Sequence, residues 1–583
     1  MRSFTQSLTL AAALLTSTAV AVNPVSVKGQ DFVDSSTGKR FMIVGVDYQP
    51  GGQSGYKPAD GKDPLTDKDI CLRDAINIQK LGANTIRVYN VDPKLNHDDC
   101  ASIFNAAGIY MIVDVNGPAS GESINRAEPW TSYHSGYLTR VFGVLENFMN
   151  YPNTLAFFSA NEVMNDMDTG KINPQYIRAV QRDMKNYIKE HASRQIPVGY
   201  SAADVRDILE DTWAYMQCQN GDNSDSDFFG LNSYSWCGGD ATFESAGYNT
   251  LVDMFNASSV PVFFSEYGCN AVTPRVFDEV AALYGDQMKS LSGGLVYEYS
   301  QEDSNYGLAT INDNGTVSLR SDYDNLQKQY NKLDMAKIMS TDPSQTSITA
   351  PKCDASLITN SAFDTNFTLP AVCPDCDALI KNGVDSPTQG KIVEVKDTKC
   401  PNAIYGSSGG EVQDLKLNLL SNDASNAPNG QVISNPSSAS SANSTASSAP
   451  STSSTSSKSS ASSKSSTSST PSASSASSAS LTNTTLTNTT APFPVSNGTS
   501  PTLNEAAPSK NSTSSSASST NSSASQVSSP ESTSTTGSGV SSTNPSAAAA
   551  SSSIPVQETS TATSKMASTC GLVAGLAFAM LML

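Results

Sequence analysis

The sequence predicts an α/β fold, a (β/α)8 TIM barrel, followed by a disordered Ser/Thr-rich stalk. Short apolar runs alternate with amphipathic stretches over about 300 residues, eight such runs can be counted, and the composition changes sharply near Asn435. A repeated strand–helix pattern with eight strands is what a closed parallel barrel requires. A doubly wound open sheet is the alternative, but no Gly-x-Gly-x-x-Gly pattern follows the first run.

The eight predicted strands are short runs rich in Val, Ile, Phe and Tyr. They lie at residues 41–47, 84–90, 109–115, 154–160, 196–201, 227–233, 260–266 and 293–299. Between several of them apolar residues recur at helical spacing, which predicts amphipathic helices. These helices are expected at residues 67–79, 137–149, 176–188 and 277–288, the first stopping at Leu81-Gly82. The barrel domain is therefore predicted at residues 22–350.

Residues 1–21 have the features of a secretory signal peptide. Arg2 supplies a positive start, residues 8–22 are largely apolar, and Ala19-Val20-Ala21 fits a cleavage site. A core helix is the alternative interpretation. Secretion would place the ten cysteines in an oxidising compartment, so disulfides are expected.

Residues 435–562 consist mainly of Ser, Thr, Ala and Asn, with few large apolar side chains. Such a segment buries too little surface to offset the entropy cost of ordering it. In a secreted chain this composition is typical of an O-glycosylated stalk. Sequons for N-glycosylation occur at Asn256, Asn314, Asn366, Asn443, Asn483, Asn488, Asn497, Asn511 and Asn521.

Residues 563–583 end in an apolar tail that begins at Cys570. As a helix this tail would reach about 21 Å, short of the roughly 30 Å hydrocarbon core of a bilayer. An apolar tail behind small polar residues predicts a removed signal for a glycosylphosphatidylinositol (GPI) anchor. Attachment is expected at Ser560, with residues 551–553 as a second fit, and a true membrane span is the alternative. The expected location is the outer leaflet of the plasma membrane.

Charge and histidine content exclude several classes of function. The formal net charge is −19, which disfavours nucleic acid as a partner. The three histidines, His97, His134 and His191, show no metal-ligand spacing and no nucleophile motif beside them. We therefore expect no metal and no organic cofactor.

Two glutamates carry the strongest chemical signal. Glu162 follows the fourth predicted strand and Glu266 ends the seventh. In a parallel barrel such residues meet at the C-terminal mouth, where two carboxyls across one sugar ring perform retaining glycosidase or transglycosidase chemistry. The other predicted strand ends offer mainly Tyr, Asn and carboxylate side chains, which stack on sugar rings and bind hydroxyl groups.

Several long motifs resemble the fungal β-1,3-glucanosyltransferases of glycoside hydrolase family 72. They are Gly45-Val46-Asp47-Tyr48-Gln49-Pro50-Gly51-Gly52, Asn84-Thr85-Ile86-Arg87-Val88-Tyr89, Ser123-Ile124-Asn125-Arg126, Asn161-Glu162-Val163, Phe263-Phe264-Ser265-Glu266-Tyr267-Gly268-Cys269-Asn270 and Gly293-Gly294-Leu295-Val296-Tyr297. The resemblance covers about residues 25–350. The signal peptide, stalk and anchor signal also match the layout of this family.

The resemblance implies remodelling of cell-wall glucan. An internal β-1,3-glucan bond is cleaved, the chain is held covalently on Glu266, and the non-reducing end of another β-1,3-glucan accepts it. Glu162 is then the acid/base. The implied substrate contacts are Gln49, Tyr89, Asp114, Asn161, Tyr234, Tyr297 and Tyr306. Tyr299 competes with Tyr297 for one role, and the spacing to Tyr306 favours Tyr297. Donor and acceptor glucan are the expected partners, with the cell wall as a second location and covalent attachment to wall glucan as a further expectation.

The resemblance also implies three disulfides, Cys71–Cys100, Cys218–Cys353 and Cys237–Cys269. After Cys353 only Cys373, Cys376 and Cys400 precede the stalk. Three cysteines are too few for the cysteine-rich carbohydrate-binding module of some members, so the chain is placed in the branch that lacks it. Residues 351–434 are read as a Cys-containing extension in which one thiol is free or pairs between chains.

One departure from the family pattern leaves alternatives open. Ala160 stands where the family often has Gly, directly before Asn161. Its methyl group would tighten this turn and lower activity, so a weakly active or inactive glucan-binding wall protein is one alternative. A β-1,3-glucanase that uses water as the acceptor is the other, because it would use the same residues.

Overall fold

The computed structural model describes residues 22–434, except 341 and 343. Several predicted features lie outside the described residues. They are the signal peptide, the stalk, the anchor signal with Ser560, and the sequons at Asn443, Asn483, Asn488, Asn497, Asn511 and Asn521. The sequons at Asn256, Asn314 and Asn366 are described, and all three side chains are exposed.

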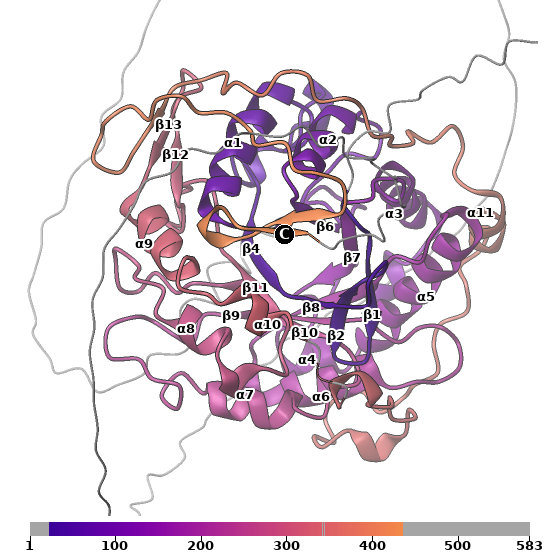
Figure 1. The fold of residues 1–583 in the computed structure, drawn as a ribbon. Coiled ribbons are helices and arrows are strands. Elements are labelled where there is room, and N and C mark those ends of the chain that lie inside the picture. Colours follow the sequence, from indigo (N-terminus) through magenta and orange to yellow (C-terminus); the bar gives the residue numbers. More distant parts are fainter. Residues whose placement is uncertain (1–21, 341, 343, 435–583) are drawn as a thin grey trace, which may run out of the picture. The chain divides into compact units, whose positions relative to one another are not determined.

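Eight parallel strands close into a barrel, as predicted (Figure 1). In chain order they are β4 (Ile43–Asp47), β5 (Thr85–Val88), β6 (Tyr110–Asp114), β7 (Thr154–Asn161), β8 (Val198–Ala203), β9 (Phe229–Ser233), β10 (Val262–Tyr267) and β11 (Gly293–Val296). Each strand pairs with the next along the chain, and β11 returns to pair with β4. Each predicted strand overlaps one of these, although the run 41–47 is divided between β4 and the outer strand β3 (Arg40–Phe41).

Helices surround the barrel (Figure 1). They are α1 (Lys68–Leu81), α2 (Asp98–Ala106), α3 (Ser135–Phe148), α4 (Met167–Gly170), α5 (Pro174–His191), α6 (Arg206–Gln217), α7 (Tyr248–Phe255), α8 (Glu279–Leu283), α9 (Ser321–Tyr330) and α10 (Met335–Ile338). Helix α1 begins where the Asp67 side chain accepts from the amides of Asp69 and Ile70, and it ends at Gly82 in the left-handed conformation.

The single helix expected at residues 277–288 was wrong. The structure has only the short helix α8, followed by a 3-10 turn at Asp286–Met288. Buried Phe277, Val280, Leu283 and Met288 produced the helical pattern. However, Phe277 has a φ of 55° and Gly285 is extended, so the backbone leaves the helical conformation at both points.

The barrel interior separates a packed lower half from a polar mouth. Alternate residues of a strand face opposite sides. Ile43 packs inside the barrel with Leu155, Phe263 and Leu295, whereas Val44 belongs to the larger cluster beneath the helices. The antiparallel strands β1 (Val25–Lys28), β2 (Asp31–Asp34) and β3 add Val25, Phe32 and Phe41 to the inner cluster. The polar residues lie toward the opposite, C-terminal ends of the strands.

Residues 351–434 pack against the helices of the barrel. Helix α11 (Cys376–Asn382) contacts α5 and α3, and β14 (Ile404–Tyr405) pairs with β13 (Val317–Leu319), which also pairs with β12 (Ala309–Ile311). Strands β15 (Ala424–Asn426) and β16 (Val432–Ser434) form a final hairpin. The Asn426 amide nitrogen donates to the carbonyls of Gln79 and Ala83. This extension therefore completes hydrogen bonds at the end of α1.

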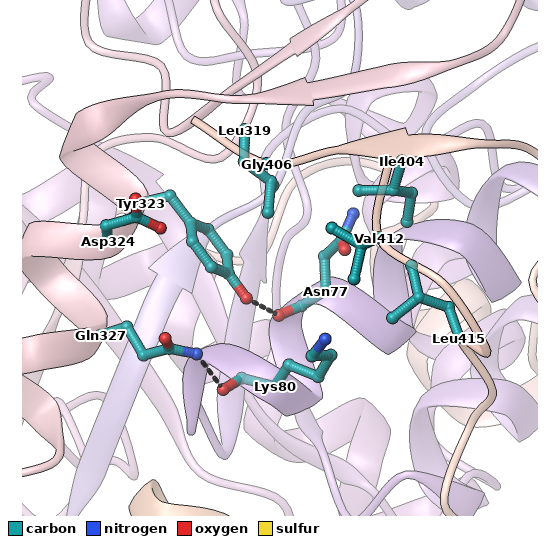
Figure 2. A pocket seen from close by; sticks show the side chains of 10 residues that line it. All are labelled: Asn77, Lys80, Leu319, Tyr323, Asp324, Gln327, Ile404, Gly406, Val412 and Leu415. Carbon is teal, nitrogen blue, oxygen red and sulfur yellow. Dashed lines mark hydrogen bonds between the residues drawn. The ribbon is translucent and has the colours of Figure 1, made fainter. Parts of the chain in front are cut away.

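The extension also covers a small pocket of about 170 Å³ (Figure 2). Asn77 and Lys80 of α1, Tyr323 of α9, and Ile404 and Val412 of the extension are among its lining residues. The Tyr323 hydroxyl donates to the carbonyl of Asn77 at 2.7 Å. The pocket contains neither predicted catalytic glutamate nor any other predicted sugar contact.

The three disulfides implied by the resemblance are present, Cys71–Cys100, Cys218–Cys353 and Cys237–Cys269. A fourth joins Cys373 to Cys376 in the extension. Cys400 is the cysteine of the described chain that forms no disulfide.

Across residues 22–434, apart from 341 and 343, none of the helices has both the length and the apolar character needed to cross a bilayer.

Candidate active site

The two predicted catalytic glutamates lie at the C-terminal mouth of the barrel. Glu162 directly follows β7, and Glu266 lies near the end of β10. In the barrel, β8 and β9 lie between β7 and β10. Parallel strands bring their C-terminal ends to one rim, which is why residues 104 positions apart in the chain share one site.

Glu266 is held as an anion would be. Its Oε1 accepts from the Tyr89 hydroxyl at 2.9 Å and from Arg87 Nη1 at 3.2 Å. Its Oε2 accepts from the Tyr234 hydroxyl at 2.7 Å. The residue is only 4% exposed. Three donors, one of them cationic, fix both oxygens and favour the carboxylate form.

Glu162 has a different environment. Its Oε1 accepts one hydrogen bond, from the Asn232 amide at 2.8 Å, and the residue is partly exposed. Its φ is 49°, in the left-handed region that non-glycine residues rarely adopt. The Glu162 amide donates to the Ser201 carbonyl of β8 at 2.9 Å, which supports this turn. Backbone strain of this kind is common where a functional side chain must be aimed.

Arg87 of β5 connects the mouth. It donates to both oxygens of Asp114 at 3.1 and 2.9 Å, to Asn161 Oδ1 at 2.9 Å, and to Glu266. Its guanidinium lies over the rings of Tyr89 and Phe158, with centroid distances of 4.3 and 4.4 Å. A planar, permanently charged fork suits this simultaneous contact with several acceptors.

Two amides link the glutamates. Asn161 Oδ1 accepts from both Arg87 and Asn232, at 2.9 and 3.1 Å. Asn232 therefore donates to Glu162 and Asn161, while Arg87 donates to Asn161 and Glu266. Ser201 and Ser265 hydroxyls donate to Asn232 Oδ1, which fixes the orientation of that amide. The two carboxyls belong to one hydrogen-bonded network.

Burial raises the pKa of both glutamates above the usual range of the residue. For Glu266 the charge of Arg87 opposes burial, Glu162 adds to the increase, and the hydrogen bonds from Tyr234 and Tyr89 lower the pKa again. For Glu162 the Asn232 hydrogen bond and the charges of Arg87 and Arg126 oppose burial. Glu266 accepts three hydrogen bonds and Glu162 accepts one, so hydrogen bonding favours the ionised form more strongly at Glu266 than at Glu162.

Gln49 and Asp114 lie at the same mouth, as expected. The Gln49 carbonyl oxygen accepts from the amides of Tyr89 and Asn90. Its buried Nε2 has no partner among the described residues, so it is a donor available to a ligand. Asp114 is 5% exposed and holds Arg87 through both oxygens.

Four tyrosines form an aromatic wall. Tyr297 contacts Tyr306, Tyr89 and Tyr234 with ring-centroid distances of 5.3, 6.4 and 6.4 Å, and Tyr234 contacts Tyr306 at 5.5 Å. All four were predicted as sugar contacts. Aromatic faces beside a carboxylate pair are typical of a carbohydrate site.

The structure separates Tyr297 from Tyr299. Tyr297 is part of the aromatic wall, whereas Tyr299 is fully buried and its hydroxyl donates to Asp74 of α1 at 2.8 Å. Buried Arg275 supports the wall from behind, because it donates to the carbonyls of Tyr297 and Tyr306 while its Nε binds Asp322 at 2.7 Å.

Ala160 does not disturb the catalytic turn. It is a buried residue of β7, and its φ is not positive. Alanine adopts extended backbone without strain. Asn161 and Glu162 directly after it make the hydrogen bonds described above, so the added methyl group leaves the constellation intact.

Sequence reasoning missed several residues of the mouth. Arg87 lies within one of the motifs that resemble the family, and Asn232 lies within the predicted strand at 227–233, but the sequence assigned neither residue a role. The side chains of both residues face the barrel interior. The alternation of inward-facing and outward-facing residues along β5 and β9 was therefore the signal that could have found them. Arg275 follows no strand pattern, and only the folded loop places it behind the tyrosines.

Comparisons with known proteins agree with this geometry. A family model described as glucanosyltransferase matches residues 14–334. The 1,3-beta-glucanosyltransferase gel2 of Aspergillus fumigatus is 56% identical over 415 residues, which cover 71% of this chain and 86% of that protein. The probable 1,3-beta-glucanosyltransferase GAS3 of Saccharomyces cerevisiae is 48% identical, with coverage of 67% and 78%.

A solved structure agrees as well. Saccharomyces cerevisiae Gas2p, a glutamate-to-glutamine mutant in complex with laminaritetraose and laminaripentaose, is 36% identical and superposes with a TM-score of 0.54. The match covers 60% of this chain and 75% of Gas2p. The family model spans more than half of the chain, and the curated relatives share its sequence well beyond the level at which a family is established. The chain belongs to the glucanosyltransferase family, glycoside hydrolase family 72.

Proposed function

We propose that this glucanosyltransferase cleaves an internal β-1,3-glucan bond with Glu266 as nucleophile and Glu162 as acid/base, and passes the retained chain to the non-reducing end of a second β-1,3-glucan. The single observation that carries these roles is the unequal donor set, three donors on Glu266 and one on Glu162. The laminari-oligosaccharides bound to Gas2p support β-1,3-glucan as the substrate.

In the first step Glu162 gives its proton to the glycosidic oxygen. The Glu266 carboxylate attacks the anomeric carbon as the bond to that oxygen breaks, and the reducing-end fragment leaves with the proton. In the second step the Glu162 carboxylate takes a proton from an acceptor hydroxyl. That oxygen attacks the anomeric carbon, and the ester bond to Glu266 breaks. Two displacements at one carbon retain its configuration.

Asn161 fits the role of binding the sugar 2-hydroxyl. Its carbonyl oxygen is held by Arg87 and Asn232, so its amide nitrogen is the group that donates to the sugar. Gln49 Nε2, which has no partner among the described residues, is a second donor to glucan hydroxyls. The tyrosine wall would stack on the sugar rings.

The proposed location is the outer face of the plasma membrane and the cell wall. The predicted secretory signal at residues 1–21, the Ser/Thr-rich composition of 435–562 and the apolar tail support it. Release of the protein from intact cells by a phosphatidylinositol-specific phospholipase would support the anchor. Retention after that treatment, together with release by glucanase, would instead indicate covalent attachment to wall glucan.

The two roles can be separated with an aryl β-laminarioside, whose leaving group needs no protonation. Glu162→Gln should still release the aryl group in a burst and then stall, because the glycosyl-enzyme lacks its base. Glu266→Gln should release none. A burst from Glu266→Gln, or none from Glu162→Gln, would contradict the assignment.

A further inference from the structure

Two further carboxyls lie at the barrel mouth and have no part in the mechanism above. Asp47 ends β4 and is fully buried, and Glu298 follows Tyr297 and is 2% exposed. Among the described residues, neither Asp47 oxygen has a hydrogen-bond partner, and Oε1 of Glu298 has none. A buried carboxylate without partners is strongly disfavoured, whereas a neutral carboxylic acid is much less so.

The strand pattern directs Asp47 into the barrel. Val44 and Val46 of β4 belong to the cluster beneath the helices, so Ile43 and Asp47 face the interior. Asp47 pairs in register with Arg87 of β5, and the two side chains therefore leave the sheet on the same face. Arg87 is therefore a cation whose charge could offset a negative charge on Asp47.

Arg87 has no N–H left for Asp47. A guanidinium has five N–H donors. Those of Arg87 go to Asp114 through Nε and Nη2, to Asn161 through Nη2, and to Glu266 and the Ser265 carbonyl through Nη1. Another buried arginine, Arg275 behind the tyrosines, donates to Asp322 and to three backbone carbonyls.

The groups around the two carboxyls are mostly acidic or phenolic. Asp47 faces Arg87, Tyr89, Asp114, Glu266, Tyr297, Glu298 and Tyr330 of α9. Glu298 faces Asp47, Glu266, Arg275, Tyr297, Glu302 and Tyr306. Asp114 and Glu266 take the charged donors of Arg87, so two carboxyls remain for which the mouth supplies no cationic hydrogen bond.

We propose that Asp47 and Glu298 keep their protons while Glu266 is ionised, and act as neutral positioning residues that leave Arg87 to Asp114 and the nucleophile. This inference rests on the proposed role of Glu266. A second negative charge at Asp47 would compete for Arg87 and pull it from the oxygen that it shares with Tyr89. The two acids therefore protect the geometry of the nucleophile only as long as they stay protonated.

The electrostatic surroundings agree with this distribution of protons. Burial raises the pKa of Asp47 well above the usual range of the residue. The positive charge of Arg87 lowers this pKa, whereas the negative charges of Glu266, Asp114 and Glu298 raise it further. Burial, and then the charges of Glu302 and Glu266, raise the pKa of Glu298 to about 8, against a hydrogen bond from Tyr297 and the charge of Arg275.

Amide replacement tests the proposal. Asp47→Asn and Glu298→Gln mimic the neutral acids, and Asp114→Asn is the matched control, because Asp114 holds Arg87 as a carboxylate. With reduced laminarin oligosaccharides, we expect Asp47→Asn and Glu298→Gln to lose less than about threefold in kcat/KM, and Asp114→Asn at least about a hundredfold. Asp47→Asn as damaging as Asp114→Asn would overturn the proposal.

Infrared spectroscopy gives a readout that a merely structural role would not move. At neutral pH the wild type should show the carbonyl stretch of protonated carboxylic acids, and each amide variant should lose part of that band. An unchanged band in both variants would overturn the proposal. If Asp47→Asn does not fold, the spectrum of Glu298→Gln still decides the question for its group.

The pH dependence of unfolding gives a third readout with a definite sign. A carboxyl whose pKa is raised by folding makes the protein less stable as the pH rises from its ordinary pKa toward the folded value. For Glu298 this window runs from 4.5 to about 8. Glu298→Gln should therefore flatten the loss of stability across it. The activity of Glu266→Gln, measured in parallel, separates the proposed nucleophile from the proposed neutral acids. If that variant stays active, the assignment of Glu266 as nucleophile fails, while the infrared result on Asp47 and Glu298 still stands.

Discussion

The hydroxyl of Tyr234 lies 2.7 Å from Oε2 of Glu266, the shortest of the three hydrogen bonds that hold this carboxylate. Tyr234 follows β9, and Glu266 belongs to the neighbouring strand β10. The bond orients the oxygen opposite to the one that Arg87 and Tyr89 fix. It makes the nucleophile rigid at both ends.

Tyr234→Phe should lower kcat/KM about 10- to 100-fold, because a hydrogen bond to a charged group contributes about 1.5–3 kcal/mol. Transfer to reduced laminarin oligosaccharides measures the effect. Tyr299→Phe is the matched control: it also removes a buried tyrosine hydroxyl, but one that binds Asp74 of α1. That control should cost stability and not activity. Equal losses of activity in the two variants would argue against a specific role for Tyr234.

Arg87→Lys should reduce kcat/KM by more than about 100-fold. A lysine cannot reach Asp114, Asn161 and Glu266 together, and breaking one side of a buried ion pair costs about 3–5 kcal/mol. Arg73→Lys is the comparison, because Arg73 forms a similarly buried pair with Asp74 at 2.8 Å outside the mouth. Melting temperatures should fall in both variants, and activity only in the first. Activity retained in Arg87→Lys would refute the central place given to this residue.

The pH profile of kcat/KM should be bell-shaped. Activity rises as Glu266 loses its proton and falls as Glu162 loses its own, because the nucleophile must be charged and the acid neutral. Burial raises both pKa values above the ordinary 4.5, so both limbs should lie at higher pH than that value. An acid limb near the ordinary pKa would show that Glu266 is less desolvated than its 4% exposure indicates.

Two disulfides of similar loop length allow a controlled test of the catalytic loop. Cys237–Cys269 closes a separation of 32 residues and Cys71–Cys100 one of 29, so chain entropy predicts a similar stabilisation of roughly 3.5 kcal/mol for each. Cys269 lies three residues after Glu266, whereas Cys71 belongs to α1. Double replacement by Ala should lower the melting temperature alike in both cases, measured by thermal unfolding. It should lower kcat/KM only for Cys237–Cys269.

If the two double variants keep equal activity, the Cys237–Cys269 bridge has only a stabilising role. If both lose activity to the same degree below their melting temperatures, the loss reflects general loosening of the barrel. Only an unequal result would link this disulfide to the position of the nucleophile.

Much of the barrel could be predicted because its signals are local. Apolar runs mark the strands, and a capping Asp67 with Gly82 marks α1. The carboxylate pair was predictable because a charged residue at the end of an apolar strand is costly unless it is used. The helix at 277–288 failed because Phe277 and Gly285 leave helical conformation in a pattern that hydrophobicity does not record.

The roles of Arg87 and Asp47 were not accessible in the same way. Each role depends on how many hydrogen-bond donors and acceptors meet inside the closed barrel. These groups come from five strands or loops that lie far apart in the sequence. The motif around Gln49 contained Asp47 from the start. Only the folded mouth shows that its carboxyl receives no hydrogen bond from the described residues.

The most direct test of the account is product length. A chain of residues 22–434 is incubated with reduced laminarin oligosaccharides, beside its Glu162→Gln and Glu266→Gln variants, and the products are separated by size. The account predicts products longer than the donor for the wild type and none for either variant. Shorter products alone would make the chain a hydrolase, and glucan binding without any product would make it a binding protein; either result would contradict transglycosylation through this pair.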